Sequence, residues 1–257
     1  MLTFRLLVGP LVIVGLLVMS YTAFITDLSA AIASEAENKA VPEDVVIIED
    51  PEIREIIAQP TLHRQIPRIR FRSDRRTYEF LASHPPLSSQ IARRLYPQLE
   101  GYTVTQVQQG VYTIQDRSAL RGEARLIAAT ADQRIYRFQG EFRSLANLLH
   151  FTGRMVVIFR YREVREGSRT YIDTEPGFYL RIDHVFIHHI TKLLSPAIRS
   201  IVDRRVKIIV EATHTLFDRV RTDPEGLYKQ VRTWPEVQPV DLEGFRQAFV
   251  SKETVRR

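Results

Sequence analysis

The sequence predicts an α+β protein in which an antiparallel β-meander curves around one long C-terminal α-helix, behind an N-terminal signal or anchor helix. Three observations predict this. Residues 6–25 form an apolar run without charge, side chains between residues 102 and 183 alternate with a period of two, and residues 196–221 return to a period of 3.6. With 257 residues, 44% of them hydrophobic and 26% charged, the chain has the composition of a globular protein that can bury a sizeable core.

The apolar run from Leu6 to Ile25 is long enough to span a bilayer. Arg5 precedes it and Asp27 and Glu35 follow it, which favours an N-terminus inside and a translocated remainder. Ala31-Ile32-Ala33 has the small-x-small form of a signal peptidase site, so a cleaved signal peptide and a retained anchor both stay open. We therefore expect the protein in the periplasm or on the extracytoplasmic face of the inner membrane.

The chain has no cysteine, which excludes disulfides, cysteine nucleophiles and thiolate metal sites. Its formal charge of +6 and its pI near 9.7 come largely from arginine. The basic cluster, which can bind anionic headgroups or an acidic protein surface, comprises Arg64, Arg68, Arg70, Arg72, Arg75 and Arg76. Behind an export signal, nucleic acid is the poorest partner for such a cluster. A solvated basic face without a dedicated partner is the alternative.

The order of the chain suggests four parts: a signal or anchor at 1–33, a tether with a basic end at 34–72, a folded domain at 73–232 and a tail at 233–257. The tether is acidic, lacks aromatics before residue 60 and contains several prolines. The folded domain is expected to open with helices at 74–83, capped by Ser73, and at 86–95, after Pro85-Pro86. The tail carries one further short amphipathic segment.

After Gly101, alternating side chains predict a meander of five or six half-buried antiparallel strands. In the last of them, at 170–183, Ile172, Phe178 and Leu180 share one face. Ser195-Pro196 then begins a helix that should end near Asp223-Pro224. This helix is about 40 Å long at 1.5 Å per residue. Its apolar stripe needs a long partner, and the concave face of the sheet is the surface of matching size.

Short helices, an antiparallel meander and one long amphipathic helix follow one another in the order of the helix-grip fold. Over residues 77–231 the chain therefore resembles the START-like superfamily of lipid-transfer domains and polyketide cyclase relatives. The pieces that carry the resemblance are Gly153-Arg154-Met155-Val156-Val157, Tyr179-Leu180-Arg181-Ile182-Asp183 and the long helix.

The resemblance implies a cavity for an apolar ligand, such as a lipid, between sheet and helix. Its candidate lining is Tyr112, Phe138, Phe159, Tyr161, Phe178, Leu180, Ile201, Ile209 and Leu216. The same residues also suit a filled core, so both interpretations stay open. The resemblance transfers no catalytic residue.

Motifs for catalysis or metal binding are weak. His184 and His188 lie at i and i+4 beside Asp183, but Val185 stands where the metalloprotease motif needs its glutamate. Gly-x-Ser-x-Gly and phosphate-binding glycine loops do not occur. We expect no cofactor and no metal, and pairing of Asp173, Glu175 and Asp183 with Arg154 and Arg181.

Three functions are compatible with these features. The first is a non-enzymatic envelope protein that binds or carries an apolar or amphipathic ligand. The second is a structural or assembly subunit of an envelope complex, with a filled core. The third is an enzyme of the cyclase or hydrolase type that uses the cavity. The sequence favours the first.

Overall fold

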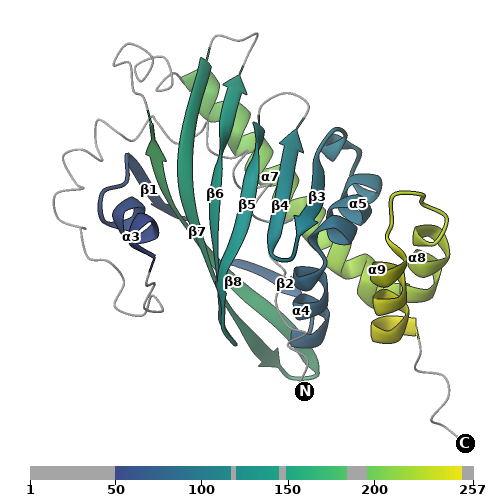
Figure 1. Cartoon of the computed structure of the whole chain (residues 1–257). Helices are drawn as coiled ribbons and strands as arrows, with labels where there is room; N and C mark the ends of the chain where they lie inside the picture. The colour runs from purple at the N-terminus through teal and green to yellow at the C-terminus, as the bar shows by residue number, and fades with distance from the viewer. Residues whose placement is uncertain (1–49, 117–119, 145–148, 184–195, 251–257) are drawn as a thin grey trace, which may run out of the picture.

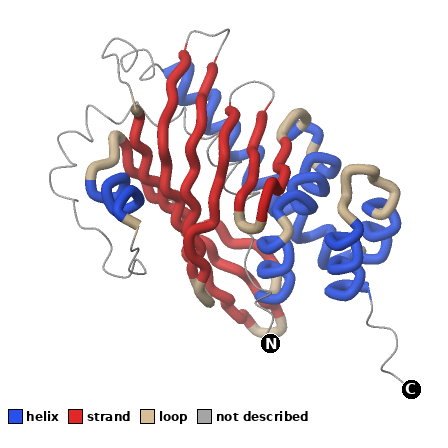
Figure 2. The backbone as a smooth tube through the Cα atoms, in the orientation of Figure 1, coloured by secondary structure: helices blue, strands red, loops and turns tan. Residues whose placement is uncertain are grey.

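The computed structural model describes residues 50–116, 120–144, 149–183 and 196–250. The expected signal or anchor, and the histidines from His184 to His189, lie outside these ranges. Within them, no helix is both long enough and apolar enough to cross a membrane. Figure 1 shows a curved sheet with helices on both of its faces, and Figure 2 shows the same layers by secondary structure.

The sheet has eight strands and is antiparallel throughout its pairings. Its meander runs through β3 (Thr103–Gln108), β4 (Val111–Asp116), β5 (Leu120–Ala129), β6 (Gln133–Ser144), β7 (Leu149–Glu166) and β8 (Arg169–Ile182). Six consecutive strands pair in chain order, which confirms the predicted meander. Ile172, Phe178 and Leu180 all lie in the concave core, as the alternation predicted.

The segment expected to be a tether is folded from Pro51 onward. Helix α3 (Pro51–Ala58) is capped by Asp50, while β1 (Leu62–Gln65) and β2 (Ile69–Arg72) both pair with β8. Ile53, Ile56 and Ile57 of α3 pack in a second apolar cluster on the convex face of the sheet. The boundary predicted at residue 73 therefore falls too late, because these short elements are stabilised by contacts with the distant strands β7 and β8.

On the concave side lie α4 (Arg75–Ser83), α5 (Pro85–Leu95), the 3-10 turn at Pro97–Leu99 and the long helix α7 (Pro196–Thr222). The bounds of these helices agree closely with the prediction. Asp74 rather than Ser73 caps α4, because its carboxylate accepts from the backbone N–H of Thr77 at 2.7 Å. Both prolines of Pro85-Pro86 lie within the first turn of α5, where a missing N–H costs little.

Helix α7 crosses behind the sheet in Figure 1. Ala212, Leu216, Phe217 and Val220 from its C-terminal half are buried in one core with Tyr136, Phe138 and Phe159 of the sheet. Phe217 stacks on Phe71 of β2 at 4.4 Å between ring centroids. A curved antiparallel sheet with a long C-terminal helix on its concave face is consistent with a helix-grip fold.

The expected tail also belongs to the folded body. It contains α8 (Pro224–Val231), α9 (Pro239–Phe245) and the π-helical turn Arg246–Val250. Phe245 is fully buried in the main core, and Arg94 of α5 stacks over the ring of Trp234 at 4.1 Å. The C-terminal segment thus closes one side of the helical layer.

Candidate functional site

The predicted cavity residues come together on the concave face of the sheet. Those with described side chains are all buried in the main core: Tyr112, Phe138, Phe159, Tyr161, Phe178, Leu180 and Leu216. The side chains of Ile201 and Ile209 fall outside the described part of α7. Strands and helix therefore meet over a largely apolar surface, and a role for these residues in ligand binding stays a prediction.

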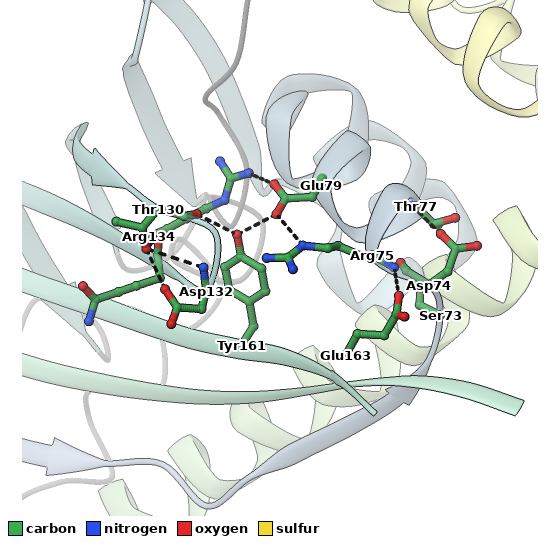
Figure 3. A network of polar contacts seen from close by, with 11 residues as sticks. Ser73, Asp74, Arg75, Thr77, Glu79, Thr130, Asp132, Arg134, Tyr161 and Glu163 are labelled. Atoms are coloured by element: carbon green, nitrogen blue, oxygen red, sulfur yellow. Dashed lines mark hydrogen bonds and ion pairs between the residues drawn. The ribbon is translucent and has the colours of Figure 1, made fainter. Parts of the chain in front are cut away.

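Sequence reasoning missed a buried charge in this surface. Arg134 shares the inward face of β6 with Tyr136 and Phe138, and its side chain is only 2% exposed. Its guanidinium forms an ion pair with Glu79 on α4, which reaches down from the helical layer (Figure 3). The sequence did contain a signal for this burial. Arg134, Tyr136 and Phe138 occupy alternate positions and therefore lie on the same face of the strand.

Tyrosines surround this ion pair. The Tyr161 hydroxyl donates to Glu79 Oε1 at 2.7 Å and also approaches the carbonyl oxygen of Thr130 at 3.3 Å. The Tyr78 ring lies 4.5 Å from the ring of Tyr161. Arg134 also interacts electrostatically with Tyr112 and Tyr136. We refer to this group as the arginine–tyrosine cluster, and it consists of Tyr78, Glu79, Tyr112, Arg134, Tyr136 and Tyr161.

Several polar atoms of the arginine–tyrosine cluster lack partners within the described residues. They are Nε and Nη1 of Arg134 and the hydroxyl oxygens of Tyr78 and Tyr112. A buried polar group without a partner costs about 1–3 kcal/mol, so native proteins usually satisfy such groups by protein, water or ligand. These atoms are therefore donors and acceptors that remain available for a further hydrogen bond.

Burial keeps the tyrosines of the cluster protonated. Desolvation raises the pKa of Tyr78, Tyr112 and Tyr136, and it raises the pKa of Tyr161 to about 12 with help from its hydrogen bond to Glu79. At neutral pH the cluster offers neutral hydroxyls and guanidinium N–H groups. Such groups donate hydrogen bonds to an oxygen acceptor and hold it in an otherwise apolar surrounding.

Much of the basic cluster is already paired. Arg70 binds both carboxylate oxygens of Asp173, at 2.6 and 3.0 Å, and Arg68 donates to Glu175 at 2.9 Å. Arg75 lies 3.8 Å from Glu79. Arg72 and Arg76 are exposed and have no ionic partner among the described residues. Arg64 pairs through its backbone with Phe178.

The acidic residues in and just after β8 differ in part from the prediction in their partners. Asp183 does bind Arg154, at 3.1 Å, but Asp173 and Glu175 pair with Arg70 and Arg68. Arg181 instead pairs with Glu55 of α3 at 2.8 Å. The prediction was therefore right for one carboxylate and wrong for two, because β2 supplies nearer arginines. No group of three or more potential metal ligands occurs among the described residues.

No protein-family model matches the chain, and no curated protein matches it. Similar solved structures include Mll3558 from Rhizobium loti, which is 12% identical with a TM-score of 0.35 and covers 60% of this chain and 97% of its own. An uncharacterized protein from Rhizobium leguminosarum is 10% identical, with a TM-score of 0.34 and coverage of 61% and 95%. Ara h 8.0201 is 13% identical, with a TM-score of 0.30 and coverage of 57% and 98%. At these values the likenesses assign neither a family nor a function.

Proposed function

We propose that this chain is a non-enzymatic envelope protein of START-like type that holds an amphipathic ligand, such as a lipid, between the concave face of its sheet and α7. The observation that carries the proposal is the guanidinium of Arg134, buried with two nitrogens lacking partners in the described structure. An acceptor oxygen on a ligand would complete its hydrogen bonds.

The surroundings of Arg134 define the character of this ligand. The apolar part of the surface comes from Phe138, Phe159, Phe178 and Leu180, while donors gather at the arginine–tyrosine cluster. Ligand sites of this kind are mostly apolar, with a few placed polar groups that fix orientation. A molecule with an apolar body and an oxygen-bearing head matches both parts.

The envelope location rests on the sequence. The apolar run from Leu6 to Ile25 targets the chain to a membrane in this proposal, and Arg72 and Arg76 remain exposed to meet anionic headgroups. Cell fractionation of the full chain checks this: we expect it with the membrane or in the periplasm. Recovery of the chain in the cytosol would contradict it.

Native mass spectrometry of the purified full chain, followed by solvent extraction, tests the ligand. We expect a bound amphipathic molecule in the wild type and at least a tenfold lower occupancy in Arg134→Met. Arg165→Met is the matched control, because Arg165 is 79% exposed on β7, and it should retain wild-type occupancy.

Two results would contradict the proposal. Equal occupancy in a folded Arg134→Met variant would show that the cluster does not hold the ligand. A wild type that carries nothing, and takes up nothing from mixed lipid vesicles, would favour the structural or assembly subunit with a filled core.

A further inference from the structure

A pocket lies on the convex face of the sheet, which is the face opposite the arginine–tyrosine cluster. Its volume is about 260 Å³, and it is lined by Asp132, Gln133, Arg160, Tyr161, Arg162, Asp173 and Glu175. Most of these are cross-strand neighbours: Gln133 pairs with Arg160, Arg160 with Glu175, and Arg162 with Asp173. The pocket therefore lies next to the patch that α3 covers, where Ile158 and Ile135 form the neighbouring row.

The carboxylate of Asp173 in this pocket is already paired with an arginine. The side chain of Asp173 is 1% exposed, and its two carboxylate oxygens accept hydrogen bonds from Nε and Nη2 of Arg70. Arg162 faces the same carboxylate only at 3.8 Å and keeps 63% of its side chain exposed. Since Arg70 already neutralises Asp173, Arg162 remains free to bind a second anionic group.

The inner wall of the pocket offers an acceptor. Gln133 is only 5% exposed, and its Oε1 atom has no hydrogen-bond partner among the described residues. Asp132 lines the same pocket, whereas Glu175 is already paired with Arg68 at 2.9 Å. The negative charge of Asp132 in the same lining as an unpaired carbonyl oxygen favours a positively charged donor. An ammonium group supplies three N–H donors and one positive charge.

Size and charge together define the ligand class. Pockets for drug-sized ligands begin at about 300 Å³, so this one suits a smaller molecule. A simple anion would be repelled by the carboxylates of the pocket, and a simple cation would be repelled by its arginines. We propose that this convex pocket binds a small zwitterion, with its primary ammonium on Gln133 Oε1 and its acidic group on Arg162. A free amino acid and a phosphoethanolamine headgroup share this chemistry.

Calorimetric titration of the full chain with glycine, phosphoethanolamine, betaine and acetate tests the proposal. We expect saturable binding of glycine or phosphoethanolamine. Betaine, whose nitrogen has no N–H, should bind at least tenfold more weakly, and acetate should not bind. Binding to vesicles that contain phosphatidylethanolamine is compared with binding to vesicles of phosphatidylcholine. If the chain binds only the former and binds neither free zwitterion, the ligand is a lipid headgroup.

Gln133→Leu and Arg162→Gln should each weaken binding of the zwitterion at least tenfold. Arg162 is largely exposed, so its variant is expected to fold even if Gln133→Leu does not. Arg125→Gln is the matched control, since Arg125 is a half-exposed arginine outside the pocket whose ionic partner is Glu123. Equal binding of betaine and glycine, unchanged affinity in Arg162→Gln, or no saturable binding of any zwitterion, free or on vesicles, would overturn the proposal.

Discussion

Arg134 and Arg137 lie three positions apart on β6 and form ion pairs on opposite faces of the same sheet. Arg134 reaches Glu79 of α4 on the concave side, and Arg137 reaches Glu52 of α3 on the convex side. Side chains alternate along a strand, so an odd separation places the two guanidiniums on different faces. The central strand is thus held between helices on both sides, and α3 adds a third layer to the sheet and its concave helices.

The convex layer predicts a measurable contribution from α3 to stability. Ile56 is fully buried, so Ile56→Ala should lower the free energy of unfolding by about 2–5 kcal/mol. Limited proteolysis should then cut between residues 50 and 60. Glu55→Gln removes only a half-exposed partner of Arg181 and should cost less than about 1 kcal/mol. Similar losses in both variants would mean that the ion pair of Glu55 contributes as much to stability as the burial of Ile56, which would contradict this prediction.

Glu79 compensates the buried charge of Arg134, which predicts an asymmetry between single and double variants. Glu79→Gln should lower the free energy of unfolding by about 3 kcal/mol, because it leaves a guanidinium buried without its counterion. The double variant Glu79→Met with Arg134→Met should regain most of this loss in urea unfolding. Arg75→Gln is the control, because the Arg75 side chain is 49% exposed and its Nε approaches Glu79 no closer than 3.8 Å. Additive losses in the double variant would contradict the coupling.

Local pattern predicted the elements whose stability depends on an extended apolar face. The alternation at 170–183 gave the correct faces, because each side of β8 contacts a different core. Helix α3 was not predicted, because eight residues beside several prolines have the sequence pattern of a tether. Its stability depends on the packing of Ile53 and Ile56 against β7 and β8, which local sequence does not show. The burial of Arg134 was not predicted either, because its compensating carboxylate comes from another element, 55 residues earlier in the chain.

A row of glycines crosses the concave face and predicts another sensitive position. Gly122, Gly140 and Gly153 are paired across β5, β6 and β7. A Cβ atom on Gly140 would lie 2.5 Å from the carbonyl oxygen of Arg121 and 2.8 Å from the Phe138 ring. Gly140→Ala should therefore lower the free energy of unfolding by about 3 kcal/mol.

Gly167→Ala is the comparison for this variant. Gly167 has a φ of +60° but open space around its Cβ position, so alanine there should cost only about 1 kcal/mol. Chemical denaturation of the two variants separates the steric effect from the backbone effect. Equal losses would show that the tight packing at Gly140 is relieved at little cost.

The pairing of Asp173 with Arg70 predicts a specific dependence of stability on pH. Hydrogen bonding to Arg70 lowers the pKa of the Asp173 carboxyl in the folded chain, whereas an unfolded aspartate titrates near about 3.9. The stabilisation is therefore complete above the unfolded pKa and is lost as the pH falls toward the folded pKa. Asp173→Asn should be less stable than the wild type at pH 7, and the difference should narrow steadily below about pH 4. Urea unfolding across this pH range measures the difference, with Arg165→Gln as a control that should track the wild type. A gap between wild type and Asp173→Asn that stays constant with pH would exclude titration of this carboxylate as its cause.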